Sequence, residues 1–419
     1  MNKRIILFIL ILGYSLHAAA QLSIEACQKK ARENYPLVKK YGLIAQSKAY
    51  SLSNAAKGYL PQFSVNAKLS YQSDVTSIPI SLPGVEIPKL SKEQYQAVIE
   101  ANQTVWDGGI IRSQKKITQA GSEAESKQLE VELYALDERV NQLFFGILML
   151  DARLVQNSIL QEELGRNFRT IVSYVDNGIA NQADLDAVKV EQLNTEQNFT
   201  QLQSTRTAYM EMLSIMTGIN IDDSMALIKP GIRNALTAMQ INRPELQWFD
   251  AQNELLDSQK DLLQSAYMPR LGLFIQAGVG RPGLNMISNS FDPFYIGGLR
   301  LTWNFGSLYT QKNDLRKIEV NKGLVETQRE VFLYNINLAL SRENQDIKRL
   351  RDLMKYDDEI IALRENIRKA AESKVANGTI TVTELMQELS REDLARQTKV
   401  GHEIDFLIAI YNLKNTTNN

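Results

Sequence analysis

Four stretches of the sequence alternate between apolar and polar residues with a period of two, which is typical of a strand with one apolar face. They are residues 62–72, 94–106, 270–280 and 294–305. In the first stretch the apolar positions are Phe63, Val65, Ala67, Leu69 and Tyr71. The charged residues Lys68, Glu100, Arg270 and Arg300 all fall on the opposite phase. The pattern predicts four amphipathic strands, paired in β-hairpins over 62–106 and 270–305.

A second pattern, with apolar residues at alternating spacings of three and four, fills residues 108–176 without a proline. This spacing is typical of a coiled-coil seam, and a helix of that length would span ~100 Å. Residues 306–376 show the same pattern. Each segment is followed by an Asn-Gly pair and a second helical stretch, so we predict long helical hairpins over 108–217 and 306–413. Shorter helices, 24–59 and 244–267, are expected to stop before Pro61 and Pro269.

The two halves of the chain resemble each other at an offset of about 200 residues. Residues 34–38 recur at 242–246, residues 58–61 at 266–269, and residues 175–178 at 375–378, always in the same order. We interpret this as a duplication, with a first repeat over 21–221, a linker over 222–241 and a second repeat over 242–419. Each repeat contains a helix, a β-hairpin and a long helical hairpin.

The first twenty residues have the features of a secretory signal peptide. Lys3 and Arg4 precede an apolar run over residues 5–12, and three alanines at 18–20 supply small residues for cleavage. We therefore predict a signal peptide over residues 1–20 and a mature chain that leaves the cytoplasm.

Composition narrows the function classes. The 419 residues include 47 Lys and Arg against 48 Asp and Glu, which argues against a basic nucleic-acid-binding face. A single cysteine excludes an intramolecular disulfide and a thiolate zinc site. With 10 Pro and 22 Gly there are few turns, which favours long uninterrupted elements.

The alternating strands could form a soluble antiparallel sheet packed on a core, or part of a membrane barrel. Strand lengths near the ~9–11 residues of a tilted spanning strand, aromatic residues near strand ends and the signal peptide favour the barrel. Four strands cannot close a barrel, because an open edge in lipid leaves backbone groups without partners. Several chains are therefore expected to share one barrel.

Other sequence features that could suggest a binding or catalytic site have simpler explanations. The glycine pattern over residues 278–283 lacks the helix that a dinucleotide site requires, and fits an external turn. His402 is interpreted as a surface or packing residue. The paired acids Asp357-Asp358 and Glu162-Glu163 are expected on solvated helix faces. No residues assemble a nucleophile, base and oxyanion donor, so we predict neither an enzyme nor a cofactor or metal site.

The arrangement resembles the outer membrane efflux protein family, the TolC-like outer membrane factors, over essentially the whole mature chain. The resemblance rests on short motifs that occur in order and in duplicate: Tyr59-Leu60-Pro61 and Tyr267-Met268-Pro269, residues 105–109 with Arg112, and the hairpin tips with Asp184-Leu185 and Glu384-Leu385. The segment 305–307 departs from the pattern, because a second glycine and a following arginine are missing.

The resemblance implies a mainly α fold with a small membrane β part. Long coiled-coil hairpins would form an α-barrel tunnel in the periplasm, and four strands per chain would contribute to a twelve-stranded barrel in a homotrimer. It also implies an outer membrane channel of a Gram-negative bacterium, acting in tripartite efflux or type I secretion. The implied partners are a periplasmic adaptor protein and an inner-membrane pump of the resistance-nodulation-division or ABC type. The competing interpretation is a non-conducting periplasmic coiled-coil scaffold.

Two sets of candidate site residues follow from the repeat and the resemblance. The hairpin tips are predicted to dock the adaptor, or else to be tight turns only: Asn177, Gly178, Ile179, Asn377, Gly378 and Thr379. Asp184, Asp186 and Glu384 lie just beyond the tips and are predicted to form an acidic gate near the periplasmic end. The alternative is that these acids stabilise a helix N-terminus.

Overall fold

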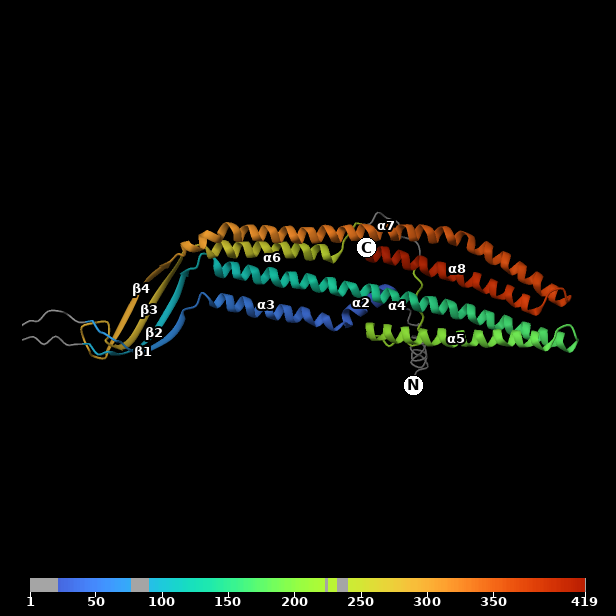
Figure 1. The fold of residues 1–419 in the computed structure, drawn as a ribbon, viewed down its shortest axis with the longest axis horizontal. Coiled ribbons are helices and arrows are strands. Elements are labelled where there is room, and N and C mark those ends of the chain that lie inside the picture. Colours follow the sequence, from blue (N-terminus) through green and yellow to red (C-terminus); the bar gives the residue numbers. More distant parts are fainter. Residues whose placement is uncertain (1–21, 77–89, 223–224, 232–239, 419) are drawn as a thin grey trace, which may run out of the picture. The chain divides into compact units, whose positions relative to one another are not determined.

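The computed structural model describes residues 22–76, 90–222, 225–231 and 240–418. The predicted signal peptide and parts of the predicted linker lie outside the described residues. The elements, labelled in Figure 1, are α2 (Ile24–Asn34), η1 (Pro36–Val38), α3 (Lys39–Lys57), β1 (Gln62–Tyr71), β2 (Glu93–Trp106), α4 (Ile110–Asp176), α5 (Gln182–Thr217), α6 (Pro244–Ala266), β3 (Arg270–Arg281), β4 (Asp292–Thr302), η2 (Phe305–Ser307), α7 (Leu308–Ala376) and α8 (Val382–Thr417).

The chain divides into two compact units, and each takes segments from both halves of the sequence. Unit 1 comprises Met1–Lys40, Leu129–Leu246 and Glu330–Asn419, and unit 2 comprises Tyr41–Gln128 and Gln247–Arg329. The long helices α4 and α7 each contribute their first residues to unit 2 and the rest to unit 1.

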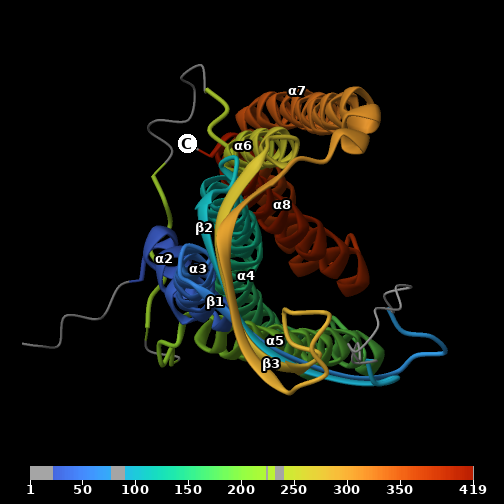
Figure 2. The same cartoon turned by 90° about the vertical axis from the view of Figure 1, so that its left-hand side faces the viewer.

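Unit 2 contains one antiparallel sheet with the strand order β1-β2-β3-β4. Figures 1 and 2 show the four strands side by side in a single curved layer. The helices of this unit are joined by ion pairs between their side chains. Lys116 of α4 contacts Asp261 of α6 at 2.6 Å, and Lys260 of α6 contacts Glu319 of α7 at 2.7 Å.

The connections from sheet to helix differ between the two halves. Before α4, Gly108 and Gly109 both have positive φ, 72° and 92°, and Asp107 accepts the N–H of Gly109 at 2.9 Å. Before α7, the 3-10 turn η2 takes the place of this double-glycine turn, and Asn304 accepts the N–H of Gly306 at 3.1 Å. The departure noted in the sequence at residues 305–307 thus corresponds to a different local geometry.

Unit 1 contains two antiparallel helical hairpins, α4 with α5 and α7 with α8 (Figure 1). Buried apolar residues from α2, α4, α5, α7 and α8 form one core that includes Cys27, Phe144, Phe145, Leu213 and Leu407. Among the described helices, α4 is long and apolar enough to suit a membrane span by length and composition. Its buried residues Val140, Phe144, Phe145 and Ile147 belong to this core, so packing accounts for much of its apolar character.

Polar contacts around Tyr134 of α4 join segments of unit 1 that lie far apart in the sequence. Its hydroxyl donates to the carbonyl oxygen of Asn415 at 2.6 Å, and the guanidinium carbon of Arg243 lies 4.5 Å from its ring centroid. Burial raises the pKa of the Tyr134 hydroxyl to about 12. Nearby, Tyr411 of α8 donates to Glu25 of α2 at 2.8 Å. The hydrogen bond from Tyr411 to Glu25 thus joins the last helix to the first described one, and Tyr134 joins α4 to α8.

The predicted helix over residues 24–59 is wrong in one respect, because the chain breaks at Tyr35. Tyr35 has an extended conformation, with φ −66° and ψ 130°, and Pro36 begins the short turn η1. The cause is the steric conflict that pushes a residue before proline out of the helical region. The corresponding Pro244 instead lies at the first position of α6, where its missing N–H has no cost.

Two further expectations need correction. The last strand ends at Thr302 rather than Phe305, and Trp303 beyond it donates its indole N–H to the carbonyl oxygen of Tyr267 at 3.1 Å. The paired acids do not lie together on solvated faces, because Asp357 is buried against His402 at 2.9 Å. Successive helix residues point about 100° apart, so one member of a pair can face inward while the next faces solvent.

Candidate functional site

One face of the sheet is apolar and has no cover within the described chain. Each register row places residues of the same phase together, as in Val65, Ile99, Ala277 and Tyr295. The large side chains of this face are exposed, with Leu69 at 75% and Tyr295 at 83%. An uncovered apolar face of this extent is not expected on a soluble monomer and fits contact with lipid.

The opposite face of the sheet carries the polar and charged side chains. Glu100 of β2 accepts from Gln276 of β3 at 2.9 Å, and Arg300 of β4 approaches Glu100 at 3.5 Å. The guanidinium of Arg300 also lies 4.6 Å from the ring centroid of Phe274. The polar side chains of this face can form hydrogen bonds with water.

The outer strands of the sheet leave backbone groups open. Within the described residues β1 pairs with β2 alone, and β4 pairs with β3 alone. Each outer edge thus presents N–H and C=O groups that a further strand could pair. In a bilayer such groups must be paired, since no water is present to replace the missing partners.

The hairpin tips have nearly the same geometry in both halves. Gly178 and Gly378 adopt left-handed conformations, with φ 72° and 66°, and donate to Val175 and Val375 at 3.0 and 2.9 Å. The preceding residues Asn177 and Asn377 donate their side-chain amides back to the carbonyl oxygens of Ser173 and Ser373 at 2.7 and 2.8 Å. The six predicted tip residues are all exposed.

The predicted gate acids take part in hydrogen bonds at the start of the returning helices. Asp184 accepts the N–H of Asn181 at 3.0 Å and donates its own N–H to the Asn181 side chain at 3.2 Å. Glu384 forms the same reciprocal capping box with Thr381, at 2.7 and 3.2 Å. The hydrogen bonds from the Thr381 backbone and hydroxyl lower the pKa of Glu384. Asp186 accepts from Gln182 at 2.9 Å.

A buried charged cluster between α4, α7 and α8 was not predicted from the sequence. Glu392 is 2% exposed and accepts from Arg368 at 2.7 Å and from Arg396 at 2.6 Å. Burial raises the pKa of the neighbouring acid Glu163, with Arg368 acting in the opposite direction. The apolar seam of α8 does not predict that Glu392 faces inward. One sequence feature agrees with a buried Glu392, namely the presence of Arg368 and Arg396 as two possible cationic partners.

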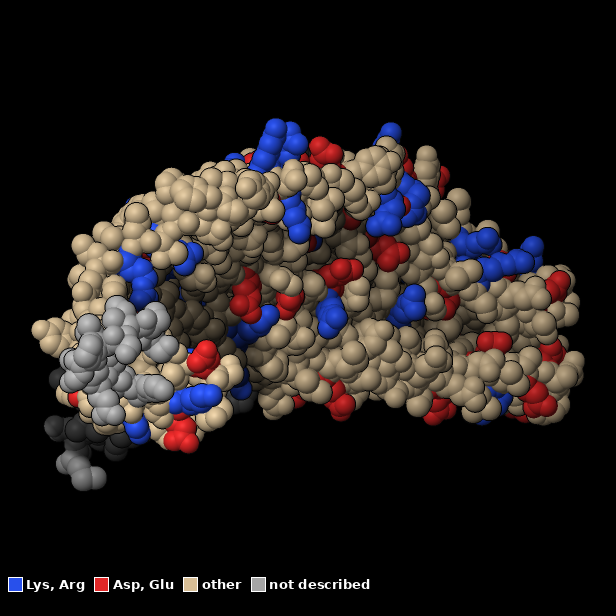
Figure 3. Space-filling model, turned by 60° about the vertical axis from the view of Figure 1, so that its left-hand side comes forward, with Lys and Arg blue, Asp and Glu red and all other residues tan. Residues whose placement is uncertain are grey.

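On the face shown in Figure 3, basic and acidic residues are interspersed along the helices, with no extended patch of one sign. This agrees with the balance of 47 basic and 48 acidic residues and with the absence of a basic stripe in the sequence.

The combination of two long antiparallel helical hairpins and a four-stranded sheet also occurs in outer membrane proteins of known structure. The chain is similar to the outer membrane channel OprN, with a TM-score of 0.72 and 14% identity over 94% of this chain and 89% of that one. It is also similar to the outer membrane protein VceC of Vibrio cholerae, with a TM-score of 0.67 and 11% identity over 94% and 96% of the two chains.

A third similar structure is the open state of the outer membrane channel MtrE of Neisseria gonorrhoeae, with a TM-score of 0.68 and 12% identity over 94% and 89% of the chains. No protein-family model matches the sequence, and no curated protein sequence matches it. The fold class predicted from the strands and helical hairpins is confirmed by these structures. At these identities the likeness establishes the fold.

We expect the stability of the protein to depend on pH because of Asp393, which follows Glu392 of the buried cluster. Burial raises the pKa of Asp393 to about 6, although a hydrogen bond from Gln397 acts in the opposite direction. Its ordinary value is 3.8, so between these values the folded chain binds more protons than the unfolded chain. The free energy of unfolding therefore falls as the pH rises from about 4 to 6. Above about pH 6 the cost of burying the ionised Asp393 carboxylate is fully present.

We predict that Asp393→Asn stabilises the protein above pH 6 by about 1–3 kcal/mol, since asparagine keeps the acceptor for Gln397 but carries no charge. It should also flatten the change in stability between pH 4 and 6. Urea unfolding followed by helical circular dichroism at several pH values measures both effects. The exposed Asp405→Asn is the matched control. A pH profile of Asp393→Asn that matches the unmodified protein would contradict the prediction.

Proposed function

We propose that this protein is the outer membrane channel component of a tripartite efflux or type I secretion system. The observation that carries the proposal is the sheet, which has one uncovered apolar face, one polar face and two open edges. Three copies would supply twelve strands, and the pairing of β1 with β4 of a neighbouring copy would remove every open edge. The apolar face would then contact lipid and the polar face would line a water-filled pore.

The surface of α7 supports assembly with further copies. Leu353, Tyr356, Ile360, Leu363 and Ile367 are all well exposed and follow one another at spacings of three and four. This is the spacing of a coiled-coil seam, and within the described residues no helix covers these five side chains. In the proposed homotrimer, helices of a neighbouring copy cover this seam and close an α-barrel tunnel in the periplasm.

The hairpin tips are proposed to dock a periplasmic adaptor, which would connect the channel to an inner-membrane pump of the resistance-nodulation-division or ABC type. Both tips are exposed, and a side chain added at Gly178 or Gly378 would meet nothing within 4 Å in the chain itself. Close to the tips, Arg166, Tyr174, Glu372 and Leu385 line a cavity of about 290 Å³ between the hairpins. Such a mixed polar and apolar groove suits a helical partner.

The channel proposal predicts that the purified protein gives stepwise conductance in planar bilayers and needs detergent for extraction. Adjacent residues of β1 provide a matched pair. Val65→Arg puts a charge on the apolar face and should cost about 2–4 kcal/mol per copy near the middle of the bilayer, with loss of insertion. Ser64→Arg places the same side chain on the polar face and should insert normally.

The competing function is a non-conducting periplasmic scaffold, in which the sheet stays out of the membrane. That protein would appear in the soluble periplasmic fraction, and Val65→Arg and Ser64→Arg would behave alike. Either result would overturn the channel.

The docking proposal is tested with Gly178→Asn and Gly378→Asn combined. Asparagine tolerates the left-handed conformation, so the turn should persist while a new side chain obstructs the tip. We expect adaptor copurification to fall about tenfold or more, which corresponds to ~1.4 kcal/mol of lost binding, with trimers and insertion intact. Gly323→Asn, also in open space, is the control. Loss of the trimer in the double variant would instead show that the tips act only as turns.

The acids Asp184, Asp186 and Glu384 are proposed to favour cations at the periplasmic end, in addition to their hydrogen bonds near the helix N-termini. Asp184→Asn with Glu384→Gln keeps an oxygen acceptor for each capping box and removes the charge. The double variant should lower the cation preference in reversal-potential recordings and weaken block by multivalent cations. Glu196→Gln serves as an exposed control. Unchanged selectivity of the double variant would leave capping as the only role of Asp184 and Glu384.

A further inference from the structure

The polar face of the sheet is interrupted by three apolar side chains. The register places Val98 of β2 and Phe294 of β4 on this face, in one row with Asn66 and Gly278. Ile296 lies two residues beyond Phe294 in β4 and therefore shares the face. Ile296 is 38% exposed, and Val98 and Phe294 are half-buried. Val98, Phe294 and Ile296 together are called the apolar patch.

Two side chains of the apolar patch meet over Gly278. A Cβ atom built on Gly278 would lie 3.1 Å from Cζ of Phe294 and 3.1 Å from Cγ2 of Val98. The far end of the ring and the valine methyl group therefore converge on the space above the glycine. The same Cβ atom would lie 2.5 Å from the carbonyl oxygen of Ala97, so glycine is required at this position. The Phe294 ring consequently lies across the neighbouring strand instead of projecting away from the sheet.

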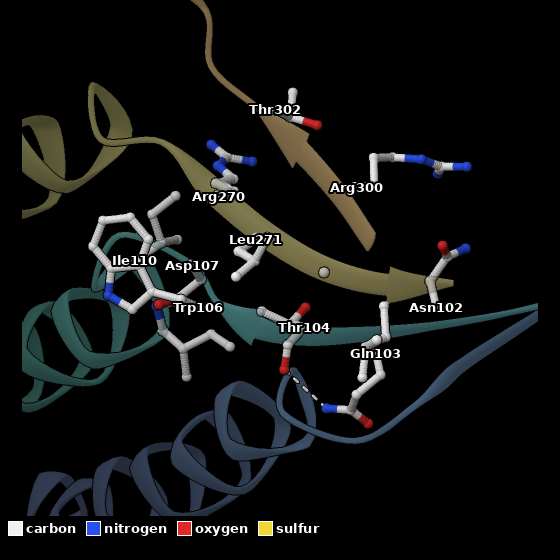
Figure 4. A pocket seen from close by; sticks show the side chains of 13 residues that line it. Asn102, Gln103, Thr104, Trp106, Asp107, Ile110, Arg270, Leu271, Arg300 and Thr302 are labelled. Atoms are coloured by element: carbon white, nitrogen blue, oxygen red, sulfur yellow. Dashed lines mark hydrogen bonds between the residues drawn. The ribbon is translucent and has the colours of Figure 1, made fainter. Parts of the chain in front are cut away.

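A second phenylalanine on this face already has a cationic partner. Phe274 lies across from Gly298, where a Cβ atom would be 3.1 Å from Cε1 of its ring. The guanidinium carbon of Arg300 lies 4.6 Å from the centroid of the Phe274 ring. In Figure 4 the side chain of Arg300 lies toward Asn102, on the side of the view away from the helices. Among the described residues no cation stacks in this way on the apolar patch, so its ring remains available.

The charged residues beside the apolar patch compensate one another. On one side Glu100 shares a row with Ile296 and approaches Arg300 at 3.5 Å. On the other side Lys68 and Asp292 belong to one row. Each side thus carries one cation and one anion, and the row of Phe294 carries neither. The surface at this level has no excess charge, and its distinguishing property is apolar area.

We propose that the apolar patch is a contact site for compounds that carry an uncharged aromatic ring. The ring lies against Phe294 and Ile296, beside Val98, and displaces no charged pair. The inference rests on the proposed channel function, because the polar face is then the pore wall and three copies bring three patches to one level of the pore. Stacked aromatic rings gain free energy beyond the burial of apolar area, so the patch retains aromatic compounds longer than polar ones.

The test compares phenyl β-glucoside with methyl β-glucoside, which carry the same sugar and differ by the ring. In planar-bilayer recordings the phenyl compound should interrupt the current with a residence time at least about fivefold longer. Phe294→Thr with Ile296→Thr keeps residues that suit a strand and should remove this difference. Phe274→Thr removes the other ring of the face and is the matched control, with little effect expected.

A second measurement does not require conductance. Saturation-transfer NMR of the protein in lipid nanodiscs should show transfer to the ring protons of phenyl β-glucoside, and the double variant should lose it. If the double variant fails to insert, Phe294→Leu keeps an apolar side chain and should shorten the residence time about twofold or more.

Several outcomes would overturn the inference. Equal losses in Phe274→Thr and in the double variant would show an effect that is not specific to the apolar patch. An unchanged residence time in the double variant, or in Phe294→Leu where that variant replaces it, would remove any role for the patch. Channels that conduct but do not distinguish the two glucosides would refute the patch and leave the channel intact. Absence of conductance would refute the channel, and the NMR comparison would then decide on the aromatic contact alone.

Discussion

The two open backbone edges of the sheet are the constraint on which the rest of the proposed channel depends. A strand edge in hydrocarbon leaves N–H and C=O groups without partners, and each costs several kcal/mol. The chain has four strands in one open sheet, so it cannot meet this requirement alone. Its apolar sheet face has the same deficiency, because nothing in the described chain covers it. Both features support the proposed assembly of several copies into one barrel.

The long helices depend on a different repeating pattern. A seam spaced by three and four residues lets α4 and α7 continue for 67 and 69 residues without a break. Ion pairs between neighbouring helices, such as Lys322 of α7 with Asp257 of α6 at 2.6 Å, lie on exposed surfaces and contribute little each. The stability of unit 1 comes mainly from the apolar core around Phe144 and Leu407.

The strands and hairpin tips could be predicted from the sequence because their signals are local. Alternation over 62–72 located β1, and Asn377-Gly378 located a left-handed turn. Pro36 is an equally local signal for the break after α2, but the helical pattern of the residues around it favours one continuous helix. The inward position of Glu392 could not be predicted, since it depends on Arg368 from another helix. The apolar patch around Gly278 likewise required the register between β3 and β4. Interactions that depend on two distant segments are visible only in three dimensions.

The core of unit 1 joins residues from the beginning and the end of the chain. Ile24 and Cys27 pack in the same cluster as Ile410 and Leu413, and Glu25 receives its hydrogen bond from Tyr411. During synthesis almost the entire chain must emerge before this core can close. An incomplete chain would therefore remain loosely packed until its final helix is available. If the predicted signal peptide directs export, this delay would keep the polypeptide unfolded until it has crossed the inner membrane, and truncated products would be exposed to proteolysis.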